Sequence, residues 1–229
     1  MSTNGTGRPI TARRLARMRG TLLRRQPGLA VVMENVADAH NVSAMLRSCD
    51  AVGAADAHLV YTIEEPPEIS KGVAASAQRW LDLRSHASIE DCYADLRKQG
   101  CAIYATTLTH DAHEFYELDL TKPSAFVFGN ESRGVSDAAV VGADAAVYIP
   151  MMGMVESLNV SVACAVALYE ALRQRQAAGM YEQLSWSDDE FDMRLRTWLE
   201  REGRDPEAAD APSGNDIPRP RNRYEYRGH

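Results

Sequence analysis

The residues best suited to chemistry lie in three short segments, and the first of them follows an apolar run. Glu34-Asn35-Val36 is followed by His40 to Arg47, where a strand is expected to end and a helix to begin. Ligands bind at the carboxyl ends of strands in open α/β sheets. Asn41 can donate, accept and cap a helix, and Arg47 is a fixed cation on the polar helix face. The same residues also fit a plain helix cap with a surface arginine.

The second segment, from Phe126 to Ser136, joins an apolar strand to a glycine loop. Gly129 and Gly134 would let the backbone approach a ligand closely. Glu131 and Arg133 lie between them. The spacing is not that of a phosphate-binding Walker loop, because no lysine stands at the required position. An ordinary glycine turn is the alternative.

The third segment runs from Ile149 to Ser161, through a loop rich in proline, glycine and methionine into an apolar helix expected to begin at Ser157. Such a helix is buried or shared with another subunit. Ser157 and Asn159, at its buried start, would need polar partners, which favours a ligand site. The methionines also fit simple core packing.

The elements that position these segments alternate along the chain. Apolar runs predict strands at 29–33, 58–61, 102–105, 125–128 and 145–149, and periodic patterns predict helices at about 10–25, 40–52, 89–98 and 157–176. This alternation predicts an α/β fold with a mainly parallel sheet and helices on both faces.

The two ends of the chain differ from its middle. We expect a basic extension at 1–28, a catalytic domain at 29–181, a helical extension at 182–203 and a disordered tail at 204–229. The amphipathic patch of the helical extension consists of Phe191, Leu195, Trp198 and Leu199.

Charge is distributed unevenly along the 229 residues, whose net charge is -7. The first 33 residues contain no acidic residue, and their seven cations are all arginine, the side chain that best forks onto phosphate. A basic segment on an acidic body is typical of an electrostatic RNA contact. A solvated basic helix without a partner is the alternative.

The remaining composition indicates a cytoplasmic protein without a metal. No apolar run is long enough for a membrane span, and the N-terminus lacks the apolar stretch of a secretion signal. The four cysteines form no C-x-x-C pair, and His110 and His113, the only closely spaced histidines, fit an ordinary loop pair better than a ligand pair. The sequence therefore predicts neither disulfides nor a metal site.

The three segments, in this order, resemble the motifs of the SPOUT class of RNA 2′-O-ribose methyltransferases. The matching stretches are N-V-S-A-M-L-R, F-G-N-E-S-R-G-V-S and I-P-M-M-G-M-V-E-S-L-N-V-S. The likeness is greatest to the TrmH group, which methylates guanosine 18 of tRNA, and it covers about residues 13–181. It implies a deep trefoil knot in the C-terminal part of the sheet, an obligate homodimer with the active site at the subunit interface, and S-adenosylmethionine as methyl donor.

The resemblance also assigns residues to roles. Those implied for catalysis are Asn41, Arg47, Glu131, Ser157 and Asn159. Those implied for donor binding are Thr106, Thr107, Leu108, Gly129, Ile149, Met154 and Leu158. Those expected to contact tRNA phosphates are Arg13, Arg14, Arg17, Arg24, Arg25, Arg173 and Arg175.

Two roles for Arg47 stay open at this stage. The proposal for the family makes Arg47 the base, although a guanidinium normally stays protonated. Arg47 could instead orient an RNA phosphate and stabilise the forming alkoxide, and Glu131 is a weaker candidate for the base. Two other functions are alternatives: methylation of ribosomal RNA, and a catalytically silent RNA-binding dimer.

Overall fold

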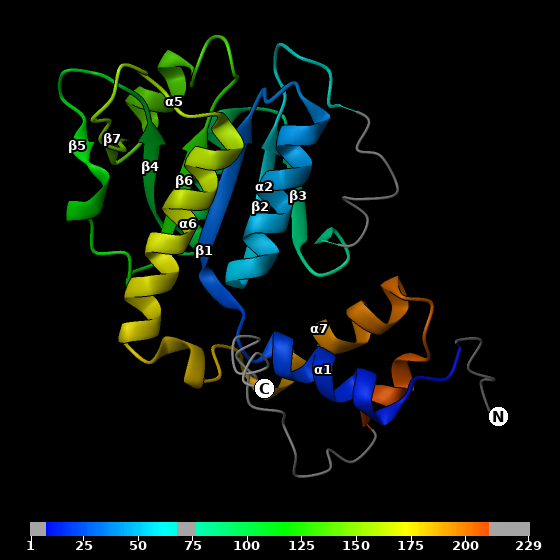
Figure 1. Ribbon diagram of the computed structural model, residues 1–229. Helices are drawn as coiled ribbons and strands as arrows, with labels where there is room; N and C mark the ends of the chain where they lie inside the picture. Colours follow the sequence, from blue (N-terminus) through cyan, green and yellow to red (C-terminus); the bar gives the residue numbers. More distant parts are fainter. Residues whose placement is uncertain (1–7, 68–76, 211–229) are drawn as a thin grey trace, which may run out of the picture. The chain divides into compact units, whose positions relative to one another are not determined.

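The computed structural model describes residues 8–67 and 77–210, which divide into two compact units (Figure 1). The larger unit spans residues 26–180, and the smaller one combines the chain up to residue 25 with the chain from residue 181. The larger unit contains a seven-stranded sheet in the order β3-β2-β1-β6-β4-β7-β5. Every strand pairing among the described residues is parallel, which confirms the mainly parallel α/β fold. The strands are β1 (Gln26–Glu34), β2 (Ala54–Val60), β3 (Asp82–His86), β4 (Ala102–Thr106), β5 (His113–Glu114), β6 (Ser124–Phe128) and β7 (Ala145–Tyr148).

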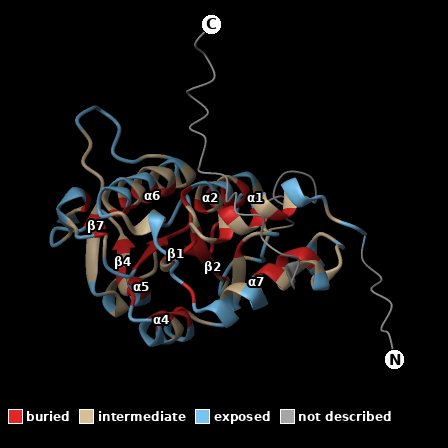
Figure 2. Ribbon diagram, turned by 90° about the horizontal axis from the view of Figure 1, so that it is seen from below, coloured by how far each residue is buried: buried red, intermediate tan, exposed pale blue. Residues whose placement is uncertain are grey.

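Helices cover both faces of this sheet. On one face lie α2 (Ala39–Val52) and α6 (Val160–Ala177), and on the other lie α4 (Ile89–Lys98) and α5 (Asp137–Gly142), as Figure 2 shows. A short 3-10 helix, η1 (Phe115–Glu117), follows β5. The larger unit therefore has three layers, with an apolar core on each side of the sheet.

The central strand β1 explains this architecture from its sequence. Leu29, Val31 and Met33 belong to the core beneath α2 and α6, whereas Ala30 and Val32 belong to the core beneath α4. All five are at most 1% exposed. A strand that is apolar at every position can only lie between two covered faces.

Local signals set most element boundaries. Ser88 caps α4, which spans the residues that the sequence predicts. Asp38 caps α2, and Gly53 ends it in the left-handed conformation.

Two elements differ from the prediction. The helix expected from Ser157 instead begins at Val160. The edge strand β3 was not predicted, because its sequence Asp-Leu-Arg-Ser-His is mostly polar and it is only partly buried.

The smaller unit contains α1 (Ala12–Leu22) and α7 (Asp188–Arg201), which pack against each other. The four residues of the predicted amphipathic patch lie on α7, where Leu195, Trp198 and Leu199 are buried. Two 3-10 helices, η2 (Met180–Glu182) and η3 (Pro206–Asp210), flank α7 along the chain. Most of the expected tail, residues 211–229, lies outside the described residues.

Candidate functional site

A cavity of about 600 Å³ opens beyond the carboxyl ends of β4, β6 and β7. All three sequence segments reach it or its rim, although they are far apart in the chain. Six of the seven residues expected to hold a methyl donor line the cavity: Thr106, Thr107, Leu108, Gly129, Ile149 and Leu158. The seventh, Met154, is not among the lining residues, and its side chain is 99% exposed.

Gly129 lets the loop after β6 turn tightly against itself. A Cβ atom at this position would lie 2.1 Å from the carbonyl carbon and oxygen of Gly134 and 2.2 Å from the nitrogen of Val135. Two backbone hydrogen bonds between Asn130 and Gly134, of 3.0 and 2.8 Å, close the same turn. Gly134 has a φ of +70°, a conformation that glycine adopts without strain. The glycines of this segment therefore shape the cavity wall.

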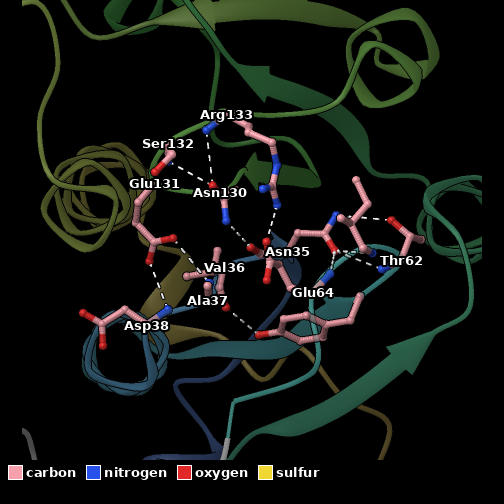
Figure 3. Close-up of polar contacts among 12 residues, drawn as sticks. Asn35, Val36, Ala37, Asp38, Thr62, Glu64, Asn130, Glu131, Ser132 and Arg133 are labelled. Carbon is pink, nitrogen blue, oxygen red and sulfur yellow. Dashed lines mark hydrogen bonds and ion pairs between the residues drawn. The ribbon is translucent and has the colours of Figure 1, made fainter.

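Two asparagines, neither assigned a role from the sequence, hold this loop against the end of β1 (Figure 3). The side chain of Asn130 donates to the carbonyl of Asn35 over 2.9 Å, and its Oδ1 accepts from the backbone N–H of Ser132 over 2.9 Å. Asn35 has a φ of +52°, and its Oδ1 accepts from three consecutive backbone N–H groups of residues 62–64. The only sequence signal for this role is an asparagine directly after an apolar strand.

Glu131 connects the glycine loop to the start of α2. Its carboxylate accepts from the Nδ2 of Asn41 over 2.8 Å and from the backbone N–H groups of Ala37 and Asp38 over 3.3 Å each. Asn159 then donates from its Nδ2 to the Oδ1 of Asn41 over 3.1 Å. A chain of side-chain hydrogen bonds, Glu131–Asn41–Asn159, therefore joins the three sequence segments.

The hydrogen bonds set the charge of Glu131. Partial burial alone would raise its pKa, but the bonds from Asn41 and from backbone N–H groups outweigh that effect and lower the pKa below its ordinary value of 4.5. The carboxylate is therefore ionised at neutral pH and already engaged as an acceptor. A general base near pH 7 needs a raised pKa, so this geometry favours a positioning role.

The start of α6 differs from the expectation. Asn159 caps the helix by accepting from the backbone N–H groups of Ser161 and Val162, over 2.9 and 3.4 Å. Ser157 precedes the helix, in the loop that lines the cavity, and both Ser157 and Asn159 are exposed. The prediction of a helix with a buried start at Ser157 was wrong, because the asparagine rather than the serine provides the cap.

Arg47 lies on the exposed face of α2 and is not among the residues that line the cavity. Within the described ranges it forms no hydrogen bond or ion pair. By contrast Asn41, at the start of the same helix, is only 9% exposed. A single chain thus brings Asn41, Glu131 and Asn159 together, but it does not bring Arg47 to the cavity.

The arginines expected to contact phosphate differ in their exposure and in their partners. Arg13, Arg17 and Arg173 are exposed, whereas Arg24 is partly buried. Arg14 pairs with Glu202 within the smaller unit. Arg25 is 1% exposed, with its guanidinium 5.3 Å from the centre of the Trp198 ring, so it does not fit the expected phosphate contact.

Arg175 requires the clearest correction. It is 1% exposed, and its guanidinium donates to the carbonyls of Leu120, Gly28 and Lys122 over 2.9, 2.6 and 2.9 Å. A side chain buried among carbonyls cannot reach RNA phosphate. Its position on an apolar helix, where α6 packs on the core, is the signal that sequence analysis overlooked.

Comparisons with known proteins place the site in context. The pattern of the SpoU rRNA methylase family matches residues 28–169. The chain is 44% identical over 194 residues to a tRNA (guanosine(18)-2′-O)-methyltransferase of Thermus thermophilus, covering 85% of this chain and all of that one.

Two solved structures resemble the fold. One is a TrmH/SpoU tRNA modifying enzyme from A. aeolicus, with a TM-score of 0.78 and 38% identity over 83% of this chain and 96% of that chain. The other is the SpoU methyltransferase AviRb from Streptomyces viridochromogenes in complex with AdoMet, with a TM-score of 0.59 and 25% identity over 68% of this chain and 64% of that chain. No helix in the part of the chain that the structure describes has the length and apolarity to cross a membrane.

Proposed function

The chain belongs to the SpoU rRNA methylase family, and we propose that it methylates the 2′-hydroxyl of guanosine 18 in tRNA, using S-adenosylmethionine. The observation that carries this proposal is the hydrogen-bonded chain Glu131–Asn41–Asn159 at the rim of a cavity that six expected donor-binding residues line. We place the enzyme in the cytoplasm, where its proposed substrate is found.

The cavity fits the methyl donor in size and chemistry. Because Gly129 has no Cβ atom, the Gly134 backbone packs directly against it, and the loop keeps the tight path that forms this part of the cavity wall. Leu108, Ile149 and Leu158 offer apolar contacts, and Thr106 and Thr107 offer polar groups. When bound, S-adenosylmethionine supplies an electrophilic methyl group on a positively charged sulfur.

The residues around the cavity have different roles in positioning the reacting groups. Glu131 and Asn159 fix both ends of the Asn41 amide, so Asn41 is held without rotamer freedom. A rigid network of this kind holds reacting groups in one geometry, which is a large part of catalysis between two bound reactants. We propose that Ser157, which is exposed on the loop of the cavity wall, contacts the incoming nucleoside.

We propose that a second copy of the chain completes the site. The loop before α6 exposes Met152, Met154 and Val155 at 93%, 99% and 64%, and α6 itself exposes Val162 and Tyr169 at 47% and 53%. Large exposed apolar side chains on one loop and on the helix that follows it are characteristic of an interface. Because Arg47 does not line the cavity of its own chain, we infer that it serves the cavity of its partner.

Within that dimer, Arg47 has one of two roles. Its planar fork suits an RNA phosphate, which would orient the ribose and stabilise the forming alkoxide. Removal of the hydroxyl proton by Arg47 itself is the alternative. The ionised and engaged state of Glu131 supports the assignment of either task to Arg47 rather than to Glu131.

We also propose the trefoil knot and the RNA contacts that the resemblance implies. The position of α6 supports the knot, because the chain returns from β7 across the sheet to pack against α2.

Exposed Arg13, Arg17 and Arg173 remain candidates for phosphate contacts. Arg173 pairs with Glu170 over 2.7 Å and would exchange that partner for RNA.

The test is methyl transfer from labelled S-adenosylmethionine to a tRNA transcript, followed by mass-spectrometric mapping of the product. We expect one methyl group, at the ribose of guanosine 18. A matched transcript with 2′-deoxyguanosine at that position should accept none. Transfer only to ribosomal RNA fragments, or tRNA binding without transfer, would contradict the proposal and favour one of the two alternatives.

A further inference from the structure

A cluster of metal-binding side chains lies in the larger unit among residues that the proposed reaction does not use. His58 comes from β2, His86 from the neighbouring edge strand β3, and Cys92 from α4, which covers that side of the sheet. Nitrogen and sulfur atoms of these three residues all lie within 4.8 Å of one another. Parallel pairing of β2 with β3 places both histidines on the face that α4 covers.

The two imidazoles face each other through one ring nitrogen each and share a hydrogen bond. Nδ1 of His58 lies 2.9 Å from Nε2 of His86, and the two rings are stacked with an angle of 16° between their planes. The other nitrogen of His58, Nε2, is buried and has no hydrogen-bond partner among the described residues. An ion held by the facing pair, Nδ1 of His58 and Nε2 of His86, would replace their mutual hydrogen bond and would leave Nε2 of His58 as it is.

The carboxylate of Asp95 lies behind the second imidazole. Its Oδ2 lies 4.0 Å from Nδ1 of His86, on the side of the ring away from His58. This arrangement favours the tautomer that carries the proton on Nδ1, which leaves the Nε2 lone pair facing His58. A metal-bound imidazole usually donates its other N–H to a carboxylate, and Asp95 would take that role in the proposed site after moving closer to His86.

The cluster is enclosed rather than solvated. His58 and Cys92 are 0% exposed, and the His86 side chain is 7% exposed. The surrounding charges include the carboxylates of Asp95 and Asp91 and the guanidinium of Arg84, which pairs with Asp56 over 3.7 Å. Acidic groups near the ligands favour a cation over an anion at this position.

We propose that His58, His86 and Cys92 form a binding site for a borderline-soft divalent cation of the zinc class. Two imidazoles and a thiolate suit Zn²⁺, whereas Mg²⁺ and Ca²⁺ require oxygen ligands. Ligand atoms on a tetrahedral zinc lie roughly 3.3–3.6 Å apart, given Zn–N of about 2.0–2.1 Å and Zn–S of about 2.3 Å. The present separations, 2.9 Å and up to 4.8 Å, bracket that range, so small side-chain shifts suffice.

The ion would take three protein ligands and one water, and it would join the edge strand β3 to β2 and α4. Binding displaces the thiol proton of Cys92, so the affinity should rise with pH. Spacing along the sequence could not reveal this site, because the strand pairing brings its ligands together. The expectation of no metal rested on that spacing alone.

Cobalt is the probe for the test, because a cysteine thiolate bound to Co²⁺ gives a charge-transfer band in the near ultraviolet. The full-length protein, treated with chelator and dialysed, is titrated with Co²⁺ and then with Zn²⁺. We expect one Co²⁺ per chain with the thiolate band, displacement of the band by Zn²⁺, and a higher Tm in the presence of Zn²⁺.

Three variants and one control locate the site. Cys92→Ser should remove the band, His86→Asn should remove stoichiometric binding, and Asp95→Asn should weaken the affinity about tenfold. Cys101→Ser is the matched control, since Cys101 is a buried cysteine of the same apolar core and should leave the band intact. Absence of Co²⁺ uptake by the wild-type protein would overturn the proposal. A full band in Cys92→Ser, or unchanged affinity in folded His86→Asn, would also overturn it.

Discussion

Within one chain, the polar side chains of the cavity wall have hydrogen-bond partners, whereas the arginine on the exposed face of α2 has none among the described residues. The wall is held by hydrogen bonds that satisfy Asn41, Asn130 and Glu131. On the face of α2, Arg47 is exposed and the structure records no partner for it among the described residues. A single chain thus prepares the donor side of the proposed reaction, and we propose that the RNA side requires a second copy.

The largest effect is expected on the donor side. Gly129→Ala should weaken the binding of S-adenosylmethionine by at least about 100-fold, because the new Cβ would overlap the Gly134 carbonyl and displace the loop that forms the cavity wall. Isothermal titration calorimetry measures this loss. Gly153→Ala is the control for donor binding, because a Cβ there meets no atom within 4 Å. Equal donor affinity for the two variants would show that the loop is not the donor cradle.

On the RNA side, Arg47→Lys should lower kcat by about 100-fold while donor affinity stays unchanged, because a planar fork becomes a point charge. Steady-state kinetics on tRNA together with donor calorimetry separate the two quantities. A loss of donor affinity that matches the loss of activity would place Arg47 in the cavity of its own chain. Near-normal turnover would remove Arg47 from both of its proposed roles.

Two arginines on α6, Arg173 and Arg175, should differ in whether their loss affects tRNA binding or the stability of the fold. Arg175→Met should lower the free energy of unfolding by about 3 kcal/mol, since it leaves buried carbonyls without their donor. Arg173→Met, on the exposed face, should leave stability nearly unchanged and weaken tRNA binding severalfold. Denaturant titration and tRNA binding measure the two effects. The reverse pattern would restore Arg175 as a candidate for RNA contact.

The smallest effect concerns the pH profile. The folded-state pKa of Glu131 lies below 4.5, so its stabilising contacts are present above that pH and are lost only as pH falls through the folded pKa. Between about pH 5.5 and 8, kcat should show no limb from Glu131. Glu131→Gln should lower kcat about tenfold by loosening Asn41 and leave the shape of the profile unchanged. Disappearance of an acid limb in Glu131→Gln would identify a general base instead.

Local sequence signals predicted much of the fold. The apolar strand β1 and the capped helix α4 follow from the periodicity and the end signals of their own residues. The mainly parallel sheet follows from the alternation of such elements. The edge strand β3 could not be predicted, because pairing with β2 rather than its own composition makes it a strand.

The candidate site was only partly predictable for the same reason. The sequence identified the segments around Asn41, Glu131 and Asn159, but not the hydrogen bonds that join them, which depend on the order of strands in the sheet. The resemblance implied an RNA contact for Arg175, and the apolar helix that carries this residue into the core was the overlooked sign of its burial. The histidines of β2 and β3 were overlooked because they meet only across the sheet.

The central claim is that each active site combines the cavity of one chain with Arg47 of the other, and mixed dimers test it most directly. Arg47→Ala and Gly129→Ala proteins, each inactive alone, are unfolded together and refolded as a mixture. Half of the dimers are then mixed, and one of their two sites has an intact cavity and an intact arginine, so activity should return to about a quarter of the wild-type level. If the mixture stays as inactive as the separate variants, each chain must build its site alone.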